Sequence, residues 1–245
     1  MPGRVGSFAR GTRAGEFILA MEHQLVRYDW NEPDRFEPIA DLERAGTGNR
    51  LNDGRTDPAG RFVVGSMWED PTAERATGGL YSVAHGVSTT LRTHLGIPNS
   101  LVFDPGRERV YWADTPTQMI IVADYDVATG AWANERPFFD YHDQSGFPDG
   151  ACLDAEGGLW SASVTGWAVI RIAADGTLTE RVELPLCKPS MPAFGGPDLT
   201  TMYVTTIGDE GGRPSEPGRD GFVPGSLLAI EGLGVTGVVD PVYAG

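Results

Sequence analysis

The chain has 245 residues and carries 34 acidic against 19 basic side chains, which gives a formal net charge of −15. This length suits a single all-β domain, and the acidic balance excludes nucleic acid as a partner, because phosphate binding needs a basic surface. No apolar run approaches the roughly 18 residues that span a bilayer, and the opening MPGRVGSFAR lacks the apolar core of a secretory signal. We therefore expect a cytoplasmic protein with no nucleic-acid and no membrane partner.

A first unit, a turn rich in Asp, Pro and Gly that leads into a strand, recurs along the chain. A degenerate copy lies at 10–20, and clear copies follow at 57–66, 104–114, 154–163 and 196–206. Three of the copies begin with an Asp, at positions 57, 104 and 154, so the repeat is 47 to 50 residues long. After each turn, Val, Phe, Trp or Tyr recurs at every second position, which is typical of a β-strand.

A second unit follows each first one. Its copies read HQLVRYDW, GGLYSVAHG, QMIIVADYDVATG, AVIRIAADG and GSLLAIEGLG, and several end in a hairpin turn. No stretch shows a helical period over three turns, so every ordered segment is predicted to be a short strand. Repeats of about 40–50 residues with four strands each are the signature of a β-propeller. A β-sandwich is the alternative, but it gives no reason for a fixed period, so we predict one β-propeller domain over residues 1–245 with about five blades.

Three polar residues share one position of the repeat. Asn52, Asn99 and Asp149 each stand five residues before the Asp that begins a turn. Equivalent positions of neighbouring blades surround the central axis of a propeller, so these side chains are predicted to converge. Two amides and a carboxylate supply hard oxygen ligands, which suit Ca²⁺, Mg²⁺ or Mn²⁺ and, less naturally, Zn²⁺. Alternatively, each is a turn residue that caps its own backbone.

Other polar residues flank these positions. Arg50 lies two residues before Asn52, on the same face of an extended strand, where it binds a substrate oxygen or is a surface side chain. Asp53 is a second acid near the site or the turn residue of Asn-Asp-Gly. Glu69 and Asp70 follow the strand FVVGSMW and either return to the same site or are solvated.

The remaining chemistry-bearing residues form no known catalytic pattern. The four histidines have no ligand spacing, and the chain contains no Gly-x-Ser-x-Gly elbow, no phosphate-binding P-loop and no His-Glu-x-x-His. Two isolated cysteines, Cys152 and Cys187, fit a reducing compartment, and their spacing leaves open whether they pair. A serine hydrolase or a nucleotide enzyme therefore has no support.

Four segments resemble one known family in order and spacing: RLNDGRTDPAGRFVVGSM, GIPNSLVFDP, FPDGACLDAEGGLW and AFGGPDLTTMYVTT. They resemble the SMP-30/gluconolactonase/regucalcin family, over essentially the whole chain. The resemblance implies a six-bladed β-propeller with a divalent metal on its axis. It also implies hydrolysis of small-molecule sugar lactones. For the metal, the oxygen-only ligands favour Ca²⁺ over Zn²⁺, with Mn²⁺ and Mg²⁺ as further candidates.

The same resemblance implies roles for particular residues. Asn99 and Asp149 resemble the metal ligands, and Asp149 is also the expected general base. Arg50 and Asn52 resemble the substrate-binding pair, with Asn52 close to the metal through water. Asp70, or its neighbour Glu69, falls where the family has a substrate-binding acid.

One departure from the family concerns the first blade. Members open with a blade whose Gly-Glu-Gly-Pro motif supplies a Glu ligand, whereas residues 1–20 resemble the second blade, and neither Glu16 nor Glu22 stands in a matching motif. We expect that Met1 is an internal start or that the chain is a fragment, and we favour the former because five blades would leave an unpaired edge. The alternative function is a propeller that binds metal or a ligand without catalysis, because that Glu is absent.

Overall fold

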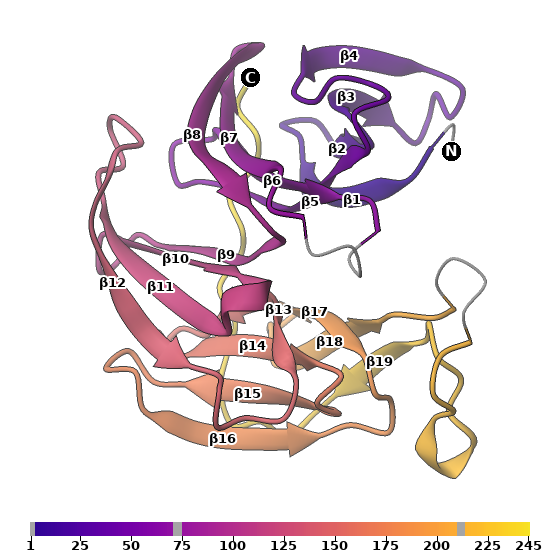
Figure 1. Cartoon of the computed structure of the whole chain (residues 1–245), viewed down its shortest axis with the longest axis vertical. Helices are drawn as coiled ribbons and strands as arrows, with labels where there is room; N and C mark the ends of the chain where they lie inside the picture. Colours follow the sequence, from indigo (N-terminus) through magenta and orange to yellow (C-terminus); the bar gives the residue numbers. More distant parts are fainter. Residues whose placement is uncertain (1–2, 71–74, 210–213) are drawn as a thin grey trace. The chain divides into compact units, whose positions relative to one another are not determined.

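The computed structural model describes residues 3–70, 75–209 and 214–245 (Figure 1). Within these ranges the helical segments are two single turns of 3-10 helix, η2 (Thr115–Thr117) and η3 (Arg219–Gly221). All other regular structure there is β-strand, which confirms the predicted all-β class. No helix in the described ranges is long and apolar enough to cross a membrane.

The strands form five sheets in which hydrogen-bonded neighbours follow chain order. The first contains β1 (Val5–Arg10), β2 (Glu16–Met21), β3 (Gln24–Asp29) and β4 (Phe36–Asp41). The second contains β5 (Asn49–Thr56), β6 (Phe62–Trp68), β7 (Gly78–Ala84) and β8 (Val87–Leu95). The third contains β9 (Pro98–Asp104), β10 (Arg109–Asp114), β11 (Met119–Tyr125) and β12 (Trp132–Asp140).

The fourth sheet contains β13 (Phe147–Leu153), β14 (Leu159–Val164), β15 (Ala168–Ile172) and β16 (Leu178–Glu183). The fifth has three strands, β17 (Pro189–Gly195), β18 (Thr201–Thr206) and β19 (Leu227–Ile230). Each sheet is a meander of the kind that makes a propeller blade. The predicted propeller with five blades is therefore confirmed.

The chain divides into two compact units. Unit 1 comprises residues 1–110, 124–133 and 240–245, and unit 2 comprises residues 111–123 and 134–239, so that the third sheet contributes to both. Each unit has its own apolar core and is described by itself. The prediction of one domain over the whole chain stays a prediction.

The core of unit 1 is built from the alternation of its strands. Ile18 and Ala20 on β2 share one face of the first sheet with Leu25 on β3, and all three are buried against Phe62 and other residues of the second sheet. The C-terminal segment completes this core, because Tyr243 joins the cluster and its backbone N–H donates to the carbonyl of Arg10 at 2.9 Å. Residues 240–245 therefore belong to the same packed unit as the first two sheets.

The core of unit 2 centres on Trp160 of β14, which is fully buried. Around it pack Cys152, Val169, Met202 and Leu228, from four different strands of the fourth and fifth sheets. Cys152 and the also buried Cys187 are both free thiols, which answers the question that their spacing left open. The cysteines here act as small apolar side chains.

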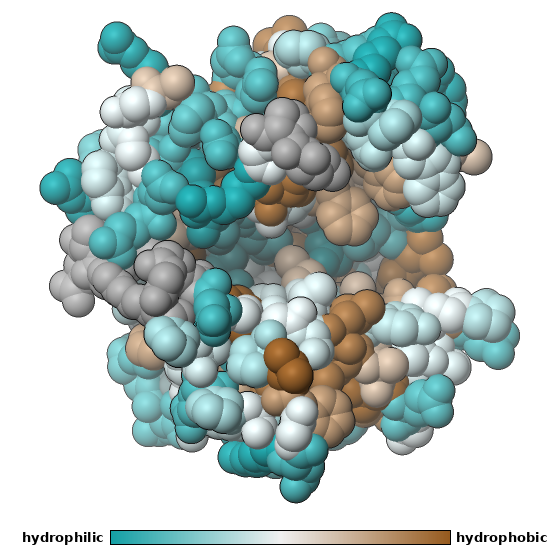
Figure 2. Space-filling model, turned by 90° about the vertical axis from the view of Figure 1, so that its right-hand side faces the viewer, coloured by the Kyte–Doolittle hydropathy of each residue, from teal (hydrophilic) through white to brown (hydrophobic). Residues whose placement is uncertain are grey.

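The edge of the fifth sheet presents apolar side chains to solvent. Leu227 on the edge strand β19 is 63% exposed, and Phe222 and Val223 shortly before it are also exposed. Figure 2 shows hydrophobic side chains in several places on one face of the molecule, between hydrophilic ones. A sheet edge with exposed leucine and valine is a surface that favours association.

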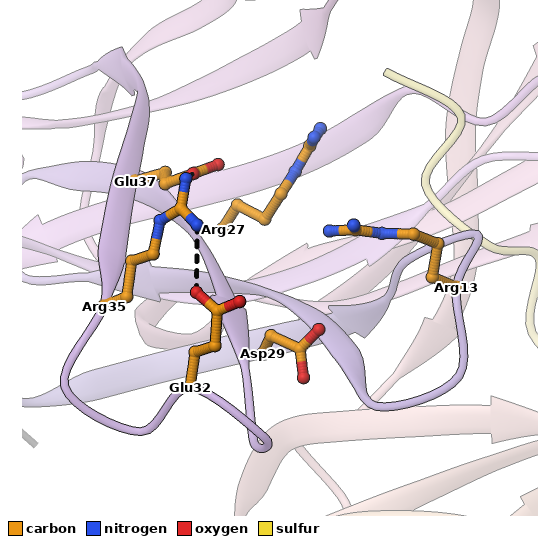
Figure 3. Close-up of a pocket in the computed structure, with 6 residues that line it drawn as sticks. All are labelled: Arg13, Arg27, Asp29, Glu32, Arg35 and Glu37. Carbon is orange, nitrogen blue, oxygen red and sulfur yellow. Dashed lines mark hydrogen bonds and ion pairs between the residues drawn. The ribbon is translucent and has the colours of Figure 1, made fainter.

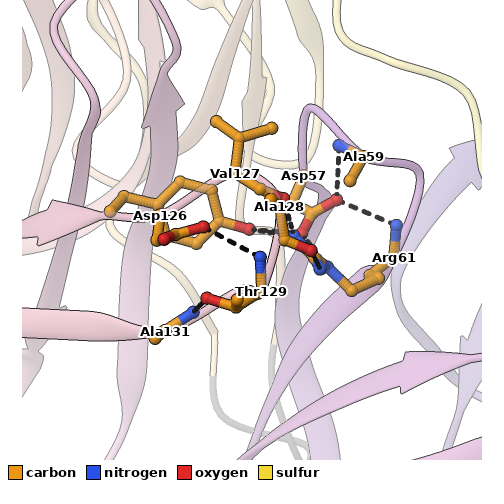
Figure 4. Close-up of polar contacts among 9 residues, drawn as sticks. Asp57, Ala59, Arg61, Asp126, Val127, Ala128, Thr129 and Ala131 are labelled. Atoms are coloured by element: carbon orange, nitrogen blue, oxygen red, sulfur yellow. Dashed lines mark hydrogen bonds and ion pairs between the residues drawn. The ribbon is translucent and has the colours of Figure 1, made fainter.

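The Asp that begins each repeat organises the turn that follows it. Asp57 is fully buried, and its Oδ1 accepts hydrogen bonds from the backbone N–H groups of Ala59 and Arg61, each at 2.9 Å (Figure 4). Asp154 does the same for Glu156 and Gly158, at 3.0 and 2.8 Å. These carboxylates are structural, because they hold the turn that follows them. The five-residue offset to the candidate site is counted back from the same Asp.

Candidate functional site

The first strand of several sheets carries a β-bulge at the position that the repeat singles out. In β5 the register shifts between Leu51 and Gly54, so Asn52 lies within the bulge. In β13 the register shifts between Pro148 and Ala151, so Asp149 lies within the equivalent bulge. A bulge interrupts the ladder and turns a side chain away from its regular alternation. Asn52 and Asp149 therefore share a bulged position, which the sequence pattern did not predict.

Asn52 and Asn99 are brought together in unit 1. The Nδ2 of Asn52 donates to Asn99 Oδ1 at 2.9 Å and to the carbonyl of Pro98 at 3.1 Å. Asn99 is almost completely buried, and Ser100 after it has a φ of 54°, which bends β9 at this point. The convergence predicted for these two amides is found, although they stand 47 residues apart in the chain.

Arg50 lies beside this pair. Its Nη1 donates to Asn52 Oδ1 at 3.2 Å and to the carbonyl of Leu51 at 3.1 Å. The guanidinium thereby fixes the orientation of the Asn52 amide, because its Oδ1 accepts from Arg50 and its Nδ2 must then face Asn99. A half-buried guanidinium next to a preorganised amide is well suited to hold the oxygen atoms of a polar substrate.

The two acids after β6 differ in their surroundings. Arg50 is the cross-strand partner of Met67, so it lies near the end of β6 that Glu69 and Asp70 follow. Glu69 forms an exposed ion pair, its Oε1 accepting from Arg4 Nη2 at 2.7 Å. Asp70 is exposed and immediately precedes residues 71–74, which lie outside the described ranges. The assignment of Asp70, or of its neighbour Glu69, to a substrate contact stays a prediction.

Asp53 is buried beneath the asparagine pair. Its Oδ2 accepts from the backbone N–H of Leu101 on β9 at 3.0 Å, and its buried Oδ1 has no hydrogen-bond partner among the described residues. Burial raises the pKa of this carboxyl above its usual range, against the opposing effects of the Leu101 N–H and the charge of Arg55. Asp53 is therefore neither an exposed turn residue nor an open site acid, because its carboxylate joins β5 to β9.

Asp149 lies in unit 2, within the bulge of β13, and is partly exposed. Near it, Tyr141 is fully buried and donates from its hydroxyl to Ser161 Oγ at 2.8 Å. Burial raises the pKa of Tyr141, and the negative charge of Asp149 raises it further. Asp149 is thus a carboxylate with one side toward solvent and a buried, protonated phenol in its surroundings.

Sequence reasoning missed Ser190, which occupies the equivalent bulge of β17. Its Oγ lies 2.8 Å from Thr205 Oγ1, and a Cβ placed on Gly150 would come within 2.6 Å of its carbonyl oxygen, so the bulges of β13 and β17 are in contact. A signal was present, because Pro-Ser at 189–190 repeats Pro-Asn at 98–99 and Pro-Asp at 148–149. Within unit 2, Ser190 therefore lies beside the bulge that carries Asp149.

The oxygen donors fit a hard divalent cation. In unit 1, an amide oxygen has two lone pairs, so the hydrogen bond from Asn52 does not by itself exhaust Asn99 Oδ1. In unit 2, Asp149 offers a carboxylate, which is also a hard oxygen donor. The two thiols are buried elsewhere, which removes the soft ligands that Zn²⁺ would use. In the described ranges no three His, Cys, Asp or Glu side chains cluster as a metal site, so a cation here depends on amide oxygens as well.

A pocket of about 250 Å³ opens on the first sheet of unit 1 (Figure 3). It is lined by Arg13, Arg27, Asp29, Glu32, Arg35 and Glu37, and none of the predicted site residues is among them. Its arginines are paired, since Arg35 pairs with Glu32 at 2.9 Å, and Arg13 and Arg27 each pair at 3.2 Å with Glu16, which is not among the lining residues. The pocket is a network of ion pairs, and the candidate site residues lie outside it.

Comparison with known proteins shows the family in which these motifs occur. The profile of the SMP-30/Gluconolactonase/LRE-like region matches residues 1–208. Regucalcin of Xenopus laevis is 33% identical over 246 residues, which cover 98% of this chain and 81% of that protein. The pentonolactonase XacC of Haloferax volcanii is 37% identical over 185 residues, 74% of this chain and 62% of that protein.

Two solved structures are similar to this chain. A luciferin-regenerating enzyme superposes with a TM-score of 0.90 at 28% identity, over 100% of this chain and 83% of its own. A calcium-binding regucalcin of Agrobacterium tumefaciens gives 0.88 at 30% identity, over 99% and 80%. The expectation that the family's first blade and its Glu ligand precede this sequence stays a prediction. The chain belongs to the SMP-30/gluconolactonase/LRE-like family.

Proposed function

We propose that this protein hydrolyses sugar lactones with the help of a divalent cation, for which Ca²⁺ is the best candidate. The observation that carries the proposal is the hydrogen-bonded pair Asn52–Asn99 on the bulged strand β5 and its neighbour β9. Asp149 is included because it occupies the equivalent bulge of β13, at the same position of the repeat. Relatives named as regucalcin and pentonolactonase, in a family named for gluconolactonase, support the same chemistry.

In this proposal the side chains have separate tasks. Arg50 and Asn52 orient the lactone through its oxygen atoms, with Asp70 as a further acceptor for a sugar hydroxyl. Asn99 and Asp149 would hold the cation, which would polarise a carbonyl oxygen and favour negative charge on it. Asp149 also accepts a proton of the attacking water, whose oxygen adds to the carbonyl carbon. The ring C–O bond then breaks, and the ring oxygen leaves as a hydroxyl by taking that proton from Asp149.

The charge of the protein suits this reaction. A net charge of −15 raises the local concentration of cations and leaves a neutral lactone unaffected. The product of lactone hydrolysis is a hydroxy acid, which is an anion at neutral pH. The acidic field therefore favours release of the product over its retention.

The test is hydrolysis of gluconolactone and a pentonolactone by the purified chain, followed by acid release at constant pH. We expect turnover that EDTA abolishes and Ca²⁺ restores better than Zn²⁺, Mn²⁺ or Mg²⁺. Asp149→Asn keeps the shape of the side chain but removes its basicity, and we expect kcat to fall by about 10²–10⁴-fold. Asp126→Asn is the matched control, since Asp126 is an exposed aspartate that accepts from the Thr129 N–H at 2.9 Å.

Two outcomes would count against the proposal. Turnover by Asp149→Asn at the rate of the control would remove Asp149 from its role. Calcium binding by calorimetry, with no turnover of any lactone in the panel, would favour a propeller that binds without catalysis.

A further inference from the structure

The carbonyl of Pro148, immediately before Asp149, is held by a side chain from another strand connection. Thr115 begins η2, directly after β10, and is 8% exposed. Its Oγ1 donates to the carbonyl of Pro148 at 2.7 Å, across 33 residues of sequence. Both residues lie in unit 2, so the contact is internal to one packed body.

The bond from Thr115 is made at the point where the bulge interrupts the ladder. Pro148 pairs with Ser163 and Ala151 pairs with Ser161, so between these two positions the ladder is interrupted. Pro148 is buried and its nitrogen carries no hydrogen, so it contributes no N–H to the ladder. A buried carbonyl without a donor costs about 1–3 kcal/mol. The hydroxyl of Thr115 supplies the donor and thereby fixes the peptide plane that connects Pro148 to Asp149.

Thr115 is itself held in place. Its β-branched side chain has few χ1 rotamers, and Pro116 restricts the backbone after it. At the other end of η2, the carbonyl of Gln118 accepts from the N–H of Tyr141 at 2.8 Å. Tyr141 is the buried residue whose hydroxyl donates to Ser161 beneath the bulge. The hydroxyl of Thr115 is therefore presented from a rigid turn.

The same carbonyl is held in the preceding repeat by different chemistry. Pro98 stands before Asn99 as Pro148 stands before Asp149, and the carbonyl of Pro98 accepts from Asn52 Nδ2 at 3.1 Å. In one repeat the donor is an amide on a neighbouring bulge, and in the other it is a hydroxyl on a 3-10 turn. Two unrelated side chains thus meet one requirement, which is to immobilise the backbone just before a candidate metal ligand.

We propose that Thr115 is a positioning residue that acts through Pro148 to aim the carboxylate of Asp149. The inference rests on the proposed function, and it assigns Thr115 no contact with substrate or cation. Loss of a group that orients a metal ligand typically costs 10–100-fold in affinity or activity. We expect Thr115→Val, which keeps the shape and removes the donor, to lower kcat and Ca²⁺ affinity by about 10-fold or more, with KM nearly unchanged.

The chain offers a matched control within the same turn. Thr117 is exposed, and its Oγ1 donates to the carbonyl of Asp114 at 2.7 Å, not to that of Pro148. Thr117→Val should therefore cost stability without lowering kcat or Ca²⁺ affinity, and Thr115→Ser, which keeps the donor, should restore both. Circular dichroism and urea unfolding show which variants fold.

A third measurement separates this inference from the proposed function. Amide hydrogen exchange at 149–151 reports on the bulge whether or not the protein is a lactonase, and we expect faster exchange there in Thr115→Val than in Thr117→Val. If the unmodified chain neither binds Ca²⁺ nor hydrolyses lactones, the proposed function fails and this exchange difference alone decides the structural role of Thr115. Equal kcat, equal Ca²⁺ affinity and equal exchange in the two valine variants would overturn the inference.

Discussion

Glu16 shows how one buried acid is kept ionised in this fold. It is 4% exposed at the start of β2, and its carboxylate accepts from the Arg13 side chain and pairs with Arg27, both at 3.2 Å. Burial alone would raise its pKa, but the hydrogen bonds from Arg13 and the charges of Arg27 and Arg13 outweigh burial and lower it. Glu16 is thus a structural charge, in agreement with its lack of a matching ligand motif.

The lowered pKa of Glu16 predicts a pH-dependent stability. A depressed folded-state pKa gives stability that is present above the unfolded value of 4.5 and is lost as the pH falls through the folded-state value. Glu16→Gln should therefore lower the free energy of unfolding by about 1–3 kcal/mol at pH 7, and by less near pH 4. Urea unfolding at both pH values measures this. Glu32→Gln, at an exposed ion pair, serves as control, and equal losses in the two variants would contradict the assignment.

Ser190 and Asp53 differ in whether the sequence pattern could have identified them. Ser190 could have been found, because its Pro-Ser pair repeats the pattern of Pro98–Asn99 and Pro148–Asp149. The burial of Asp53 could not have been predicted, because Asn-Asp-Gly is equally the sequence of an exposed turn. Its environment depends on β9 lying close enough for Leu101 to donate to it.

The turn between β5 and β6 is joined to the hairpin between β11 and β12. Arg61 donates to Asp57 through Nε and, through Nη2, to the Tyr125 hydroxyl at 2.9 Å and the Val127 carbonyl at 2.6 Å (Figure 4). The Tyr125 hydroxyl in turn donates to Asp57. All these residues belong to unit 1. One arginine therefore fixes two hairpins that are more than 60 residues apart in sequence.

Removal of this arginine should be costly. Arg61→Met leaves the buried carboxylate of Asp57 without its cation, and breaking a buried pair in this way costs about 3–5 kcal/mol. Arg107→Met is the matched control: Arg107 pairs with Asp104 at 3.0 Å in the corresponding turn, but its side chain is 37% exposed. We expect about 1 kcal/mol or less there. Urea unfolding compares the two, and a similar cost in both would show that the link between hairpins adds nothing.

For the molecule as a whole, the net charge sets the response to salt. With 34 acidic and 19 basic side chains, self-repulsion opposes the compact state, and at about 0.1 M salt charges are screened beyond ~10 Å. We expect the midpoint of thermal unfolding to rise on going from low salt to physiological ionic strength, by about 2–4 °C for each ~1 kcal/mol of repulsion relieved.

The measurement compares NaCl with choline chloride in the presence of EDTA, because the bulky choline cation does not suit an oxygen site. A rise with NaCl but none with choline chloride would indicate specific cation binding in place of general screening. A fall of the midpoint with either salt would show that favourable ion pairs, such as those of Figure 3, outweigh the repulsion.

By itself the sequence determined the all-β class, the five blades and the repeat position shared by Asn52, Asn99 and Asp149. These follow from local patterns, since strand alternation and turn chemistry are written in neighbouring residues and repeat every 47 to 50 positions. The family could likewise be identified, because its motifs are short and keep their spacing.

The tertiary structure alone decided how those positions are supported. This support has three parts: the bulges that carry Asn52 and Asp149, the amide pair of Asn52 with Asn99, and the bond from Thr115 to Pro148. Each part involves contacts that the local sequence does not predict. Each depends on how one strand lies against the next and on which unpaired carbonyl is left for a donor to satisfy. Periodicity can predict where a strand ends, but the direction of a side chain within a bulge is set by its neighbours in space.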